Sequence, residues 1–187
     1  MAKLIYAAIC SLDGFVNDAN GNFDWAMPDE EVHEAANALQ RGIGTYLYGR
    51  RMYEIMQVWG DFPGIDGEPE VVRDYAQIWA GADKHVFSST LAEVSTPRTH
   101  LHREFTPEGV RRLKETVSTD ISIGGPTIAA VALQAGLIDE IHQFLHPILI
   151  GGGTPVFPAS FRQGLELLGE RRFDSGVVHL HHRVLTD

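Results

Sequence analysis

The stretch that decides the fold is 120-DISIGGPTIAAVALQAG-136. Residues 120–123 read as a short strand, which runs directly into two glycines and a proline. Pro126 suits the first turn of a helix, and the residues that follow it are almost all apolar. A helix that is apolar on several faces must be covered on more than one side. The stretch therefore predicts an α/β sheet whose helix 126–136 lies between the sheet and another layer, such as a partner subunit.

Strands and helices alternate on both sides of this junction. The expected strands are 3–10, 45–48, 84–87, 120–123 and 141–150. The expected helices run from Pro28 to Gly42, from Gly49 through Met56, from Val71 to Gly81, from Thr106 to Val117 and from Pro126 to Gly136. This order predicts a three-layer α/β sandwich, with a mixed, mostly parallel sheet between helices on both faces.

The remaining segments complete one domain over residues 1–187. Residues 165–172 and 177–185 alternate around the turn Asp174-Ser175-Gly176, which predicts a C-terminal antiparallel hairpin. The polar stretches 11–28 and 60–69 are expected to be loops, and the first is long enough to carry function.

Composition excludes several classes of function. The net charge of −10 would repel a phosphate backbone, so we expect no nucleic-acid partner. The N-terminal residues lack the pattern of an export signal, and no stretch is long and apolar enough for a membrane span. Cys10 is the only cysteine, which favours a reducing cytoplasm and a core-packing role for that residue.

Two strand-to-helix junctions have the composition of an anion-binding site: Tyr48-Gly49-Arg50-Arg51 and Ile123-Gly124-Gly125-Pro126-Thr127. Glycine permits a close backbone approach, arginine brings positive charge, and a helix N-terminus offers free N–H groups. Such turns also need glycine for purely conformational reasons. Neither junction matches G-x-G-x-x-G, so an ordinary Rossmann dinucleotide site is not indicated. Ser88-Ser89-Thr90, at a third strand end, could bind a 2′-phosphate or simply form a cap or turn.

In this order, these segments resemble the dihydrofolate reductase-like superfamily. The similarity is greatest to its short bacterial members and to the riboflavin-pathway reductase, the RibD C-terminal domain. It spans nearly the whole chain and rests on residues 7–14, 48–54, 84–89, 123–125, 137–140 and 147–157.

The resemblance implies NADPH lying across the carboxyl edge of the sheet, with a cis peptide between Gly124 and Gly125 beneath it. It also favours a homodimer. The cofactor-binding residues that it implies are Ala8, Gly49, Arg50, Arg51, Ser88, Ser89, Gly124, Gly125, Pro126 and Thr127.

In dihydrofolate reductases, a carboxylate on the first helix binds the pterin ring. In the sequence, this carboxylate follows a Trp and a Pro. Trp25, Pro28 and Glu30 fit that spacing, so Glu30 is the expected catalytic acid and Asp29 the next choice. A buried acid beside an aromatic ring would have a raised pKa. Acids are also favoured in a first turn by the helix dipole alone.

The substrate itself is expected to contact Trp25, Asp13, Tyr53 and His146. Tyr53 also reads as core or pocket wall, and His146 as a structural histidine. Several residues depart from the folate-reducing pattern. Met52 replaces a phosphate-binding Thr, Ala129 replaces a Tyr near the nicotinamide, and Leu145-His146-Pro147 replaces a Thr-containing strand.

The sequence therefore predicts an NADPH-dependent reductase that acts on a small pterin-like, aminopyrimidine or related heterocycle. Two alternatives are an authentic dihydrofolate reductase and a non-catalytic nucleotide-binding module on the same fold.

Three histidines of the expected hairpin, His179, His181 and His182, raise the question of a metal site, since alternate residues of a strand share a face. No third ligand on another element is identified from the sequence. A partly solvated hairpin without a metal is therefore the prediction.

Overall fold

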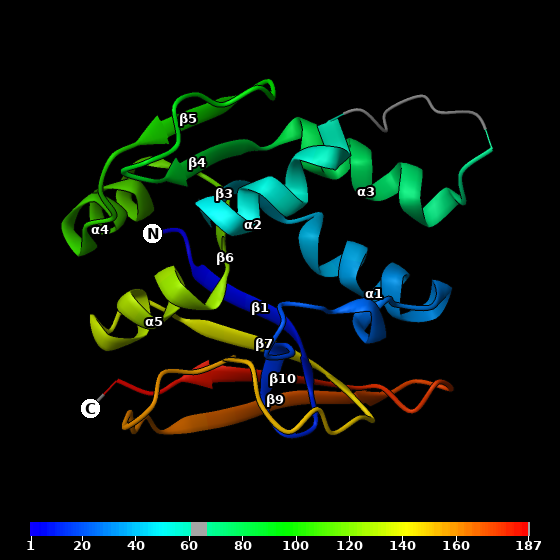
Figure 1. Cartoon of the computed structure of the whole chain (residues 1–187). Helices are drawn as coiled ribbons and strands as arrows, with labels where there is room; N and C mark the ends of the chain where they lie inside the picture. Colours follow the sequence, from blue (N-terminus) through cyan, green and yellow to red (C-terminus); the bar gives the residue numbers. More distant parts are fainter. Residues whose placement is uncertain (61–66, 187) are drawn as a thin grey trace.

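The computed structural model describes residues 1–60 and 67–186, so most of the expected loop at 60–69 lies outside the described residues. Within them, eight strands form one sheet in the order β5-β4-β3-β6-β1-β7-β10-β9, which Figure 1 shows from β5 at the top to β9 at the bottom. The strands are β1 (Leu4–Ser11), β3 (Ile43–Gly49), β4 (Asp83–Phe87), β5 (Thr99–His102), β6 (Asp120–Gly124), β7 (Glu140–His146), β9 (Leu165–Arg172) and β10 (Val178–Val184).

The first six strands in this order, β5 to β7, are parallel, and β10 and β9 close the sheet as an antiparallel pair. The predicted sheet and C-terminal hairpin are therefore confirmed. A second, antiparallel sheet pairs β2 (Phe15–Asn17), within the expected loop 11–28, with β8 (Thr154–Pro155), for which no element was predicted. Strand β5 was also not predicted.

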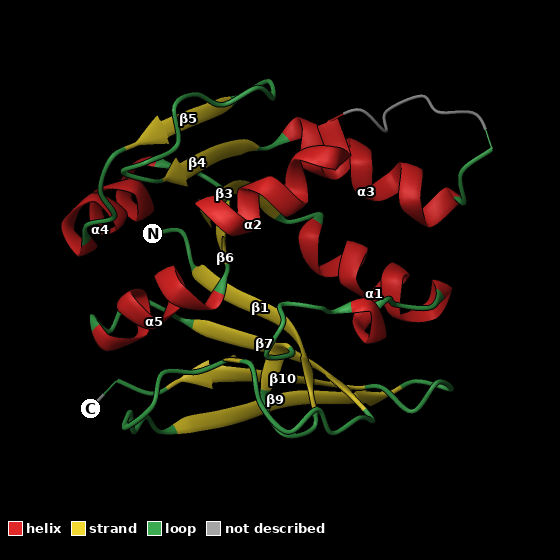
Figure 2. Ribbon diagram, in the orientation of Figure 1, coloured by secondary structure: helices red, strands yellow, loops and turns green. Residues whose placement is uncertain are grey.

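Helices cover both faces of the large sheet (Figure 2). They are α1 (Glu30–Gln40), α2 (Arg50–Met56), α3 (Glu70–Gly81), α4 (Pro107–Thr116) and α5 (Pro126–Gln134), with short 3₁₀ turns η1 (Asp24–Ala26) and η2 (Gln57–Gly60). Helices α4 and α5 pack on the face that carries Leu4, Tyr6 and Ile123. Helices α2 and α3 pack on the opposite face, where Trp79 is fully buried beside Tyr46 and Tyr48. In the described part of the chain, no helix is both long and apolar enough to cross a membrane.

Helix α5 is less enclosed than its sequence suggests. It buries Ile128, Ala129, Ala132 and Leu133 against the sheet, whereas Val131 is 40% exposed. The described residues of this chain supply no layer beyond that side chain, so a covering partner stays a prediction. Cys10 is a buried free cysteine in the core, as expected, and burial raises the pKa of its thiol.

The turn between β6 and α5 corrects one expectation. Among residues 1–60 and 67–186 there is no cis peptide bond, so the predicted Gly124–Gly125 cis peptide is wrong. The chain turns instead through Gly125, whose φ of 96° is a conformation that side chains with a Cβ rarely adopt. A left-handed glycine makes the bend with ordinary trans peptides.

A buried lysine on β4 gives a stability prediction. Lys84 is fully buried, its Nζ donates to the Trp79 carbonyl at 3.1 Å, and it lies 4.2 Å above the Trp79 ring. Burial, with help from Arg98, lowers the pKa of Lys84 from 10.5 to about 8, and Asp83 opposes this shift. Between those two values the unfolded chain binds the extra proton, so wild-type stability rises with pH there.

Lys84→Met removes this titration. Measured by urea unfolding, the stability of the variant relative to wild type is expected to fall by up to about 3 kcal/mol as pH rises from 8 to 10.5. The comparison at each pH cancels the other titrating groups. A difference that does not change with pH would show that the pKa of Lys84 is not lowered.

Candidate active site

The three predicted cofactor segments meet at one edge of the sheet. They follow the carboxyl ends of β4, β3 and β6, which are neighbouring parallel strands. In the register, Gly49 pairs with Phe87, and Tyr48 pairs with Gly124. Since neighbouring strands lie about 4.8 Å apart, these segments form one continuous rim. Such rims are where open α/β sheets bind ligands.

The glycines on this rim permit close packing of neighbouring side chains as well as close approach of a ligand. A Cβ on Gly124 would lie 2.9 Å from the Tyr48 ring, and one on Gly125 would lie 3.3 Å from Met52. The Met52 side chain thus packs against the turn. Helix α5 begins directly after the Gly124-Gly125 turn, and Thr127 is exposed in the first turn of this helix.

Arg50 and Ser88 are already engaged in the protein. The half-exposed Arg50 guanidinium pairs with Glu54 at 2.7 Å and donates to Thr90 at 3.1 Å, which holds it between the ends of β3 and β4. The Ser88 hydroxyl accepts hydrogen bonds from the backbone N–H groups of Thr90 and Leu91. Ser88 therefore forms a turn, one of the two roles expected for it. Arg51 and Ser89 are exposed on the same rim.

A cavity of about 250 Å³ lies farther along the rim, at the carboxyl end of β7. It combines the segment before α1, the residues that end β7 and the turn of the C-terminal hairpin. Its lining residues are Trp25, Met27, Asp29, His146, Pro147, Ile148, Ser175 and Val177. Only β1 separates β7 from β6 in the sheet, a sideways spacing of about 10 Å. The register also places His146 four residues beyond the level of Gly124, which adds about 13 Å along the strands, so the cavity is roughly 16 Å from the Gly124-Gly125 turn. Ala8 is on that intervening strand.

Two of the lining residues, Trp25 and His146, each hold a buried ring nitrogen. The rings of Trp25 and His146 meet edge to face, with centroids 5.9 Å apart, and His146 is only 6% exposed. Within the described residues, neither Trp25 Nε1 nor His146 Nε2 has a hydrogen-bond partner. Burial lowers the pKa of His146, which favours the neutral imidazole. Buried polar atoms normally have partners, so these two nitrogens are suited to a polar ligand.

Asp29, rather than Glu30, is the carboxylate of the cavity. Its side chain caps α1 by accepting the Val32 N–H at 2.8 Å. That hydrogen bond, followed by one from Ser175, holds the pKa of Asp29 below its usual value. The expected raised pKa is therefore wrong for Asp29, which is exposed and accepts hydrogen bonds. Glu30 begins α1 and is also exposed, so the expected burial is wrong for it as well.

Two further predicted contact residues lie outside the cavity. Asp13 accepts the N–H groups of Ile150 and Gly151, and the Ser11 hydroxyl and these amides hold its pKa low. It ties the turn after β1 to the loop after β7. The Tyr53 hydroxyl accepts the Ser95 N–H at 2.9 Å and so anchors the loop between β4 and β5.

Sequence reasoning missed several of the lining residues, among them the polar Ser175. It was read only as part of the hairpin turn, and the sheet brings that turn to the first helix: Arg171 pairs with Glu31 at 2.7 Å. The hairpin thus forms one wall of the cavity.

A mostly parallel eight-stranded sheet of this order, with helices on both faces and a terminal antiparallel hairpin, is a dihydrofolate reductase-like fold. The model of the RibD C-terminal domain matches residues 2–179. The chain therefore belongs to the RibD C-terminal domain family.

Three proteins are similar to this chain along most of its length. The uncharacterized protein YyaP of Bacillus subtilis is 28% identical over 180 residues, which are 95% of this chain and 93% of YyaP. A pyrimidine reductase-like protein from Corynebacterium diphtheriae superposes with a TM-score of 0.69 at 17% identity, covering 100% of this chain and 93% of the other. Dihydrofolate reductase from Enterococcus faecalis, complexed with NADP(H), gives a TM-score of 0.64 at 12% identity, covering 98% and 97%. These two structures establish the fold.

Proposed function

We propose that this protein is an NADPH-dependent reductase that transfers hydride to a small pterin-like, aminopyrimidine or related heterocycle. The observation that carries the proposal is the cavity formed by Trp25, Asp29 and His146, which lies two strands along the rim from the Gly124-Gly125 turn. The pyrimidine reductase-like and dihydrofolate reductase relatives of the same fold support this class of reaction.

The rim fits a dinucleotide in three respects. Gly125 lets the backbone approach a ligand closely, and the nine-residue helix α5 directs its first N–H groups to the same place. The Arg50 guanidinium is exposed enough to bind a phosphate. NADPH, when bound, would supply the hydride, and the protein would supply placement.

The cavity residues would bind and orient the substrate. Ionised Asp29 would accept N–H donors from an amino-substituted ring, which are charge-assisted hydrogen bonds. The Trp25 indole N–H would donate to a ring oxygen or nitrogen, and His146 would lie against the substrate from the sheet side. Since the pKa of Asp29 is lowered, it would be ionised at neutral pH and accept hydrogen bonds from the substrate, and the proton that completes the reduction would come from solvent.

Replacing Arg50 tests the cofactor site. Arg50→Ala is expected to weaken NADPH binding about tenfold, because a hydrogen bond to a charged group contributes about 1.5 kcal/mol or more. Binding is followed by nicotinamide fluorescence with NADPH and NADH. The matched control is Arg112→Ala on α4, where Arg112 forms a similar i,i+4 pair with Glu108 at 3.2 Å. Equal affinities in both variants would remove Arg50 from the site.

Turnover decides among the alternatives. NADPH oxidation with an aminopyrimidine or pterin supports the proposal, whereas turnover of dihydrofolate with tight methotrexate binding would indicate an authentic dihydrofolate reductase. NADPH binding with no oxidation by any of these substrates would favour the non-catalytic module. If NADPH does not bind at all, the reductase proposal fails. A cytoplasmic location and a homodimer stay predictions.

A further inference from the structure

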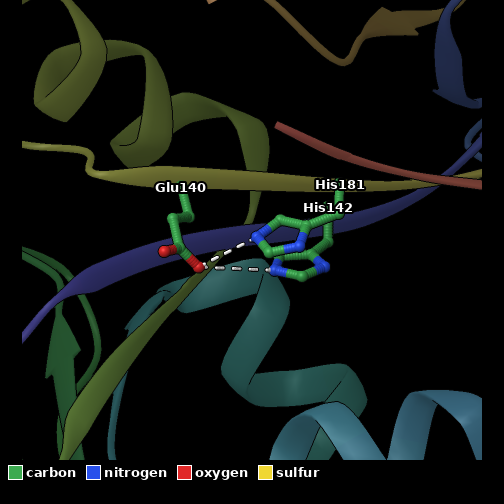
Figure 3. Close-up of side chains that lie close together, drawn as sticks. All are labelled: Glu140, His142 and His181. Atoms are coloured by element: carbon green, nitrogen blue, oxygen red, sulfur yellow. Dashed lines mark hydrogen bonds and ion pairs between the residues drawn. The ribbon is translucent and has the colours of Figure 1, made fainter. Parts of the chain in front are cut away.

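We propose that Glu140, His142 and His181 form a binding site for a divalent transition-metal ion. The three side chains project from one face of neighbouring strands, β7 and β10 (Figure 3). His142 lies directly opposite His181 in the antiparallel register, and Glu140 is two residues before His142, so all three share that face. Their candidate ligand atoms all lie within 4.8 Å of one another.

The distances suit a metal ion once the rings turn, because His142 and His181 are stacked with centroids 3.9 Å apart and planes at 17°, and a bound metal must lie near the plane of each ring. His181 Nε2 lies 3.0 Å from Glu140 Oε2, and His142 Nε2 lies 3.9 Å from the same oxygen. Ligand atoms about 2.0–2.1 Å from a tetrahedral zinc ion are roughly 3.4 Å from one another. The two observed distances bracket that value, and Figure 3 shows both nitrogens directed at the carboxylate oxygen.

His142 provides independent evidence for a ligand. Its side chain is buried, with 5% exposure for the residue, and within the described residues its Nε2 has no hydrogen-bond partner. The distance of 3.9 Å to Glu140 is too long for a hydrogen bond. An unpaired buried nitrogen costs free energy, and a metal ion between it and the carboxylate would remove that cost.

Outer contacts hold the ligands as metal sites usually require. His142 Nδ1 lies 3.0 Å from His179 Nε2. When His142 Nδ1 carries the proton and donates it to His179, the lone pair of His142 Nε2 is free to bind a metal. Lys3 Nζ contacts Glu140 Oε1 at 2.7 Å and leaves Oε2 for the metal. The positive charge of Lys3 repels a bound cation, so removing it should strengthen metal binding.

The ligand set selects the kind of ion. Two imidazole nitrogens and one carboxylate oxygen favour Zn²⁺ and its transition-metal neighbours over Ca²⁺ or Mg²⁺, which prefer all-oxygen sites. The His181 side chain is 28% exposed and gives the ion a way in from solvent. The sequence named His179, His181 and His182 without a third ligand on another element. The register supplies Glu140 and His142 from β7 and turns His182 to the opposite face.

The experiment uses full-length protein without a histidine tag, stripped of metal with EDTA. Zn²⁺ titrated calorimetrically is expected to bind one ion per chain and to raise the Tm. Co²⁺ is expected to show the visible absorption of a four-coordinate site. His181→Ala should abolish binding, and His179→Ala should weaken it about 10- to 100-fold as an outer contact. His182→Ala is the matched control with unchanged affinity, and Lys3→Ala should bind Zn²⁺ more tightly.

Three outcomes would overturn the proposal. They are no Zn²⁺ or Co²⁺ binding by the folded wild-type protein, equal losses in His181→Ala and His182→Ala, or weaker binding by Lys3→Ala. Circular dichroism checks that each variant folds. If His181→Ala does not fold, Glu140→Gln takes its place, and the Co²⁺ spectrum of the wild type is decisive.

Discussion

Trp79→Ala is expected to lower the free energy of unfolding by about 3–5 kcal/mol, the usual cost of truncating a buried Trp or Phe. Trp79 is a fully buried residue of α3 that packs against the sheet, and its indole N–H donates to the Tyr48 hydroxyl at 3.2 Å. The truncation would leave a cavity, an unpaired hydroxyl and a buried Lys84 without the aromatic face that it covers. For a chain of this length, the Tm should fall by roughly 6–20 °C.

Calorimetry or urea unfolding measures this change. Trp79→Phe keeps most of the volume but loses the indole N–H, so it should cost less than Trp79→Ala. The control is Leu149→Ala, because Leu149 is 69% exposed and its removal should change stability by less than about 0.5 kcal/mol. A loss below 1 kcal/mol for Trp79→Ala would contradict the position of α3 on the sheet.

The sequence predicted the sheet because each strand-to-helix junction has its own local signal. Residues 120–136 combine an apolar strand, a glycine turn and a proline at the first helical position, and they form β6 and α5 as expected. Strand β5 was missed because Thr99–His102 is only four residues long and contains one apolar residue, Leu101. Its pairing with β4 brings His102 against Phe87, a contact set by tertiary structure.

The candidate site was predicted less completely, because its parts come from distant segments. The order of parallel strands brings Gly49, Ser88 and Gly124 to one rim, and strand ends alone indicated this. Spacing after Trp25 could not distinguish Glu30 from Asp29, since one residue of rotation on a helix decides which side chain faces the cavity. The capping hydrogen bond from Val32 fixes that rotation in favour of Asp29.

Asp29→Asn should separate the chemical role of this carboxylate from its structural one. Asparagine caps helices about as well as aspartate, so α1 should keep its first turn and stability should change little. The charge that would accept substrate N–H groups is lost. We expect kcat/KM with the reducible heterocycle to fall by about 10- to 150-fold, because a hydrogen bond to a charged group contributes about 1.5–3 kcal/mol. NADPH affinity should stay unchanged, because the cofactor segments lie on other strands.

Two further variants make this result specific. Glu34→Gln changes an exposed acid on the same helix and should leave turnover within twofold of wild type. Asp29→Ala should lose turnover and, in addition, about 0.5–2 kcal/mol of stability through the missing cap. If Glu30→Gln abolishes turnover while Asp29→Asn does not, the substrate reaches the first helix from another side and the cavity at Trp25 and His146 is not the active site. A large loss confined to Asp29→Asn and Asp29→Ala would instead tie the reaction to the carboxylate that the Val32 N–H and Ser175 hold ionised.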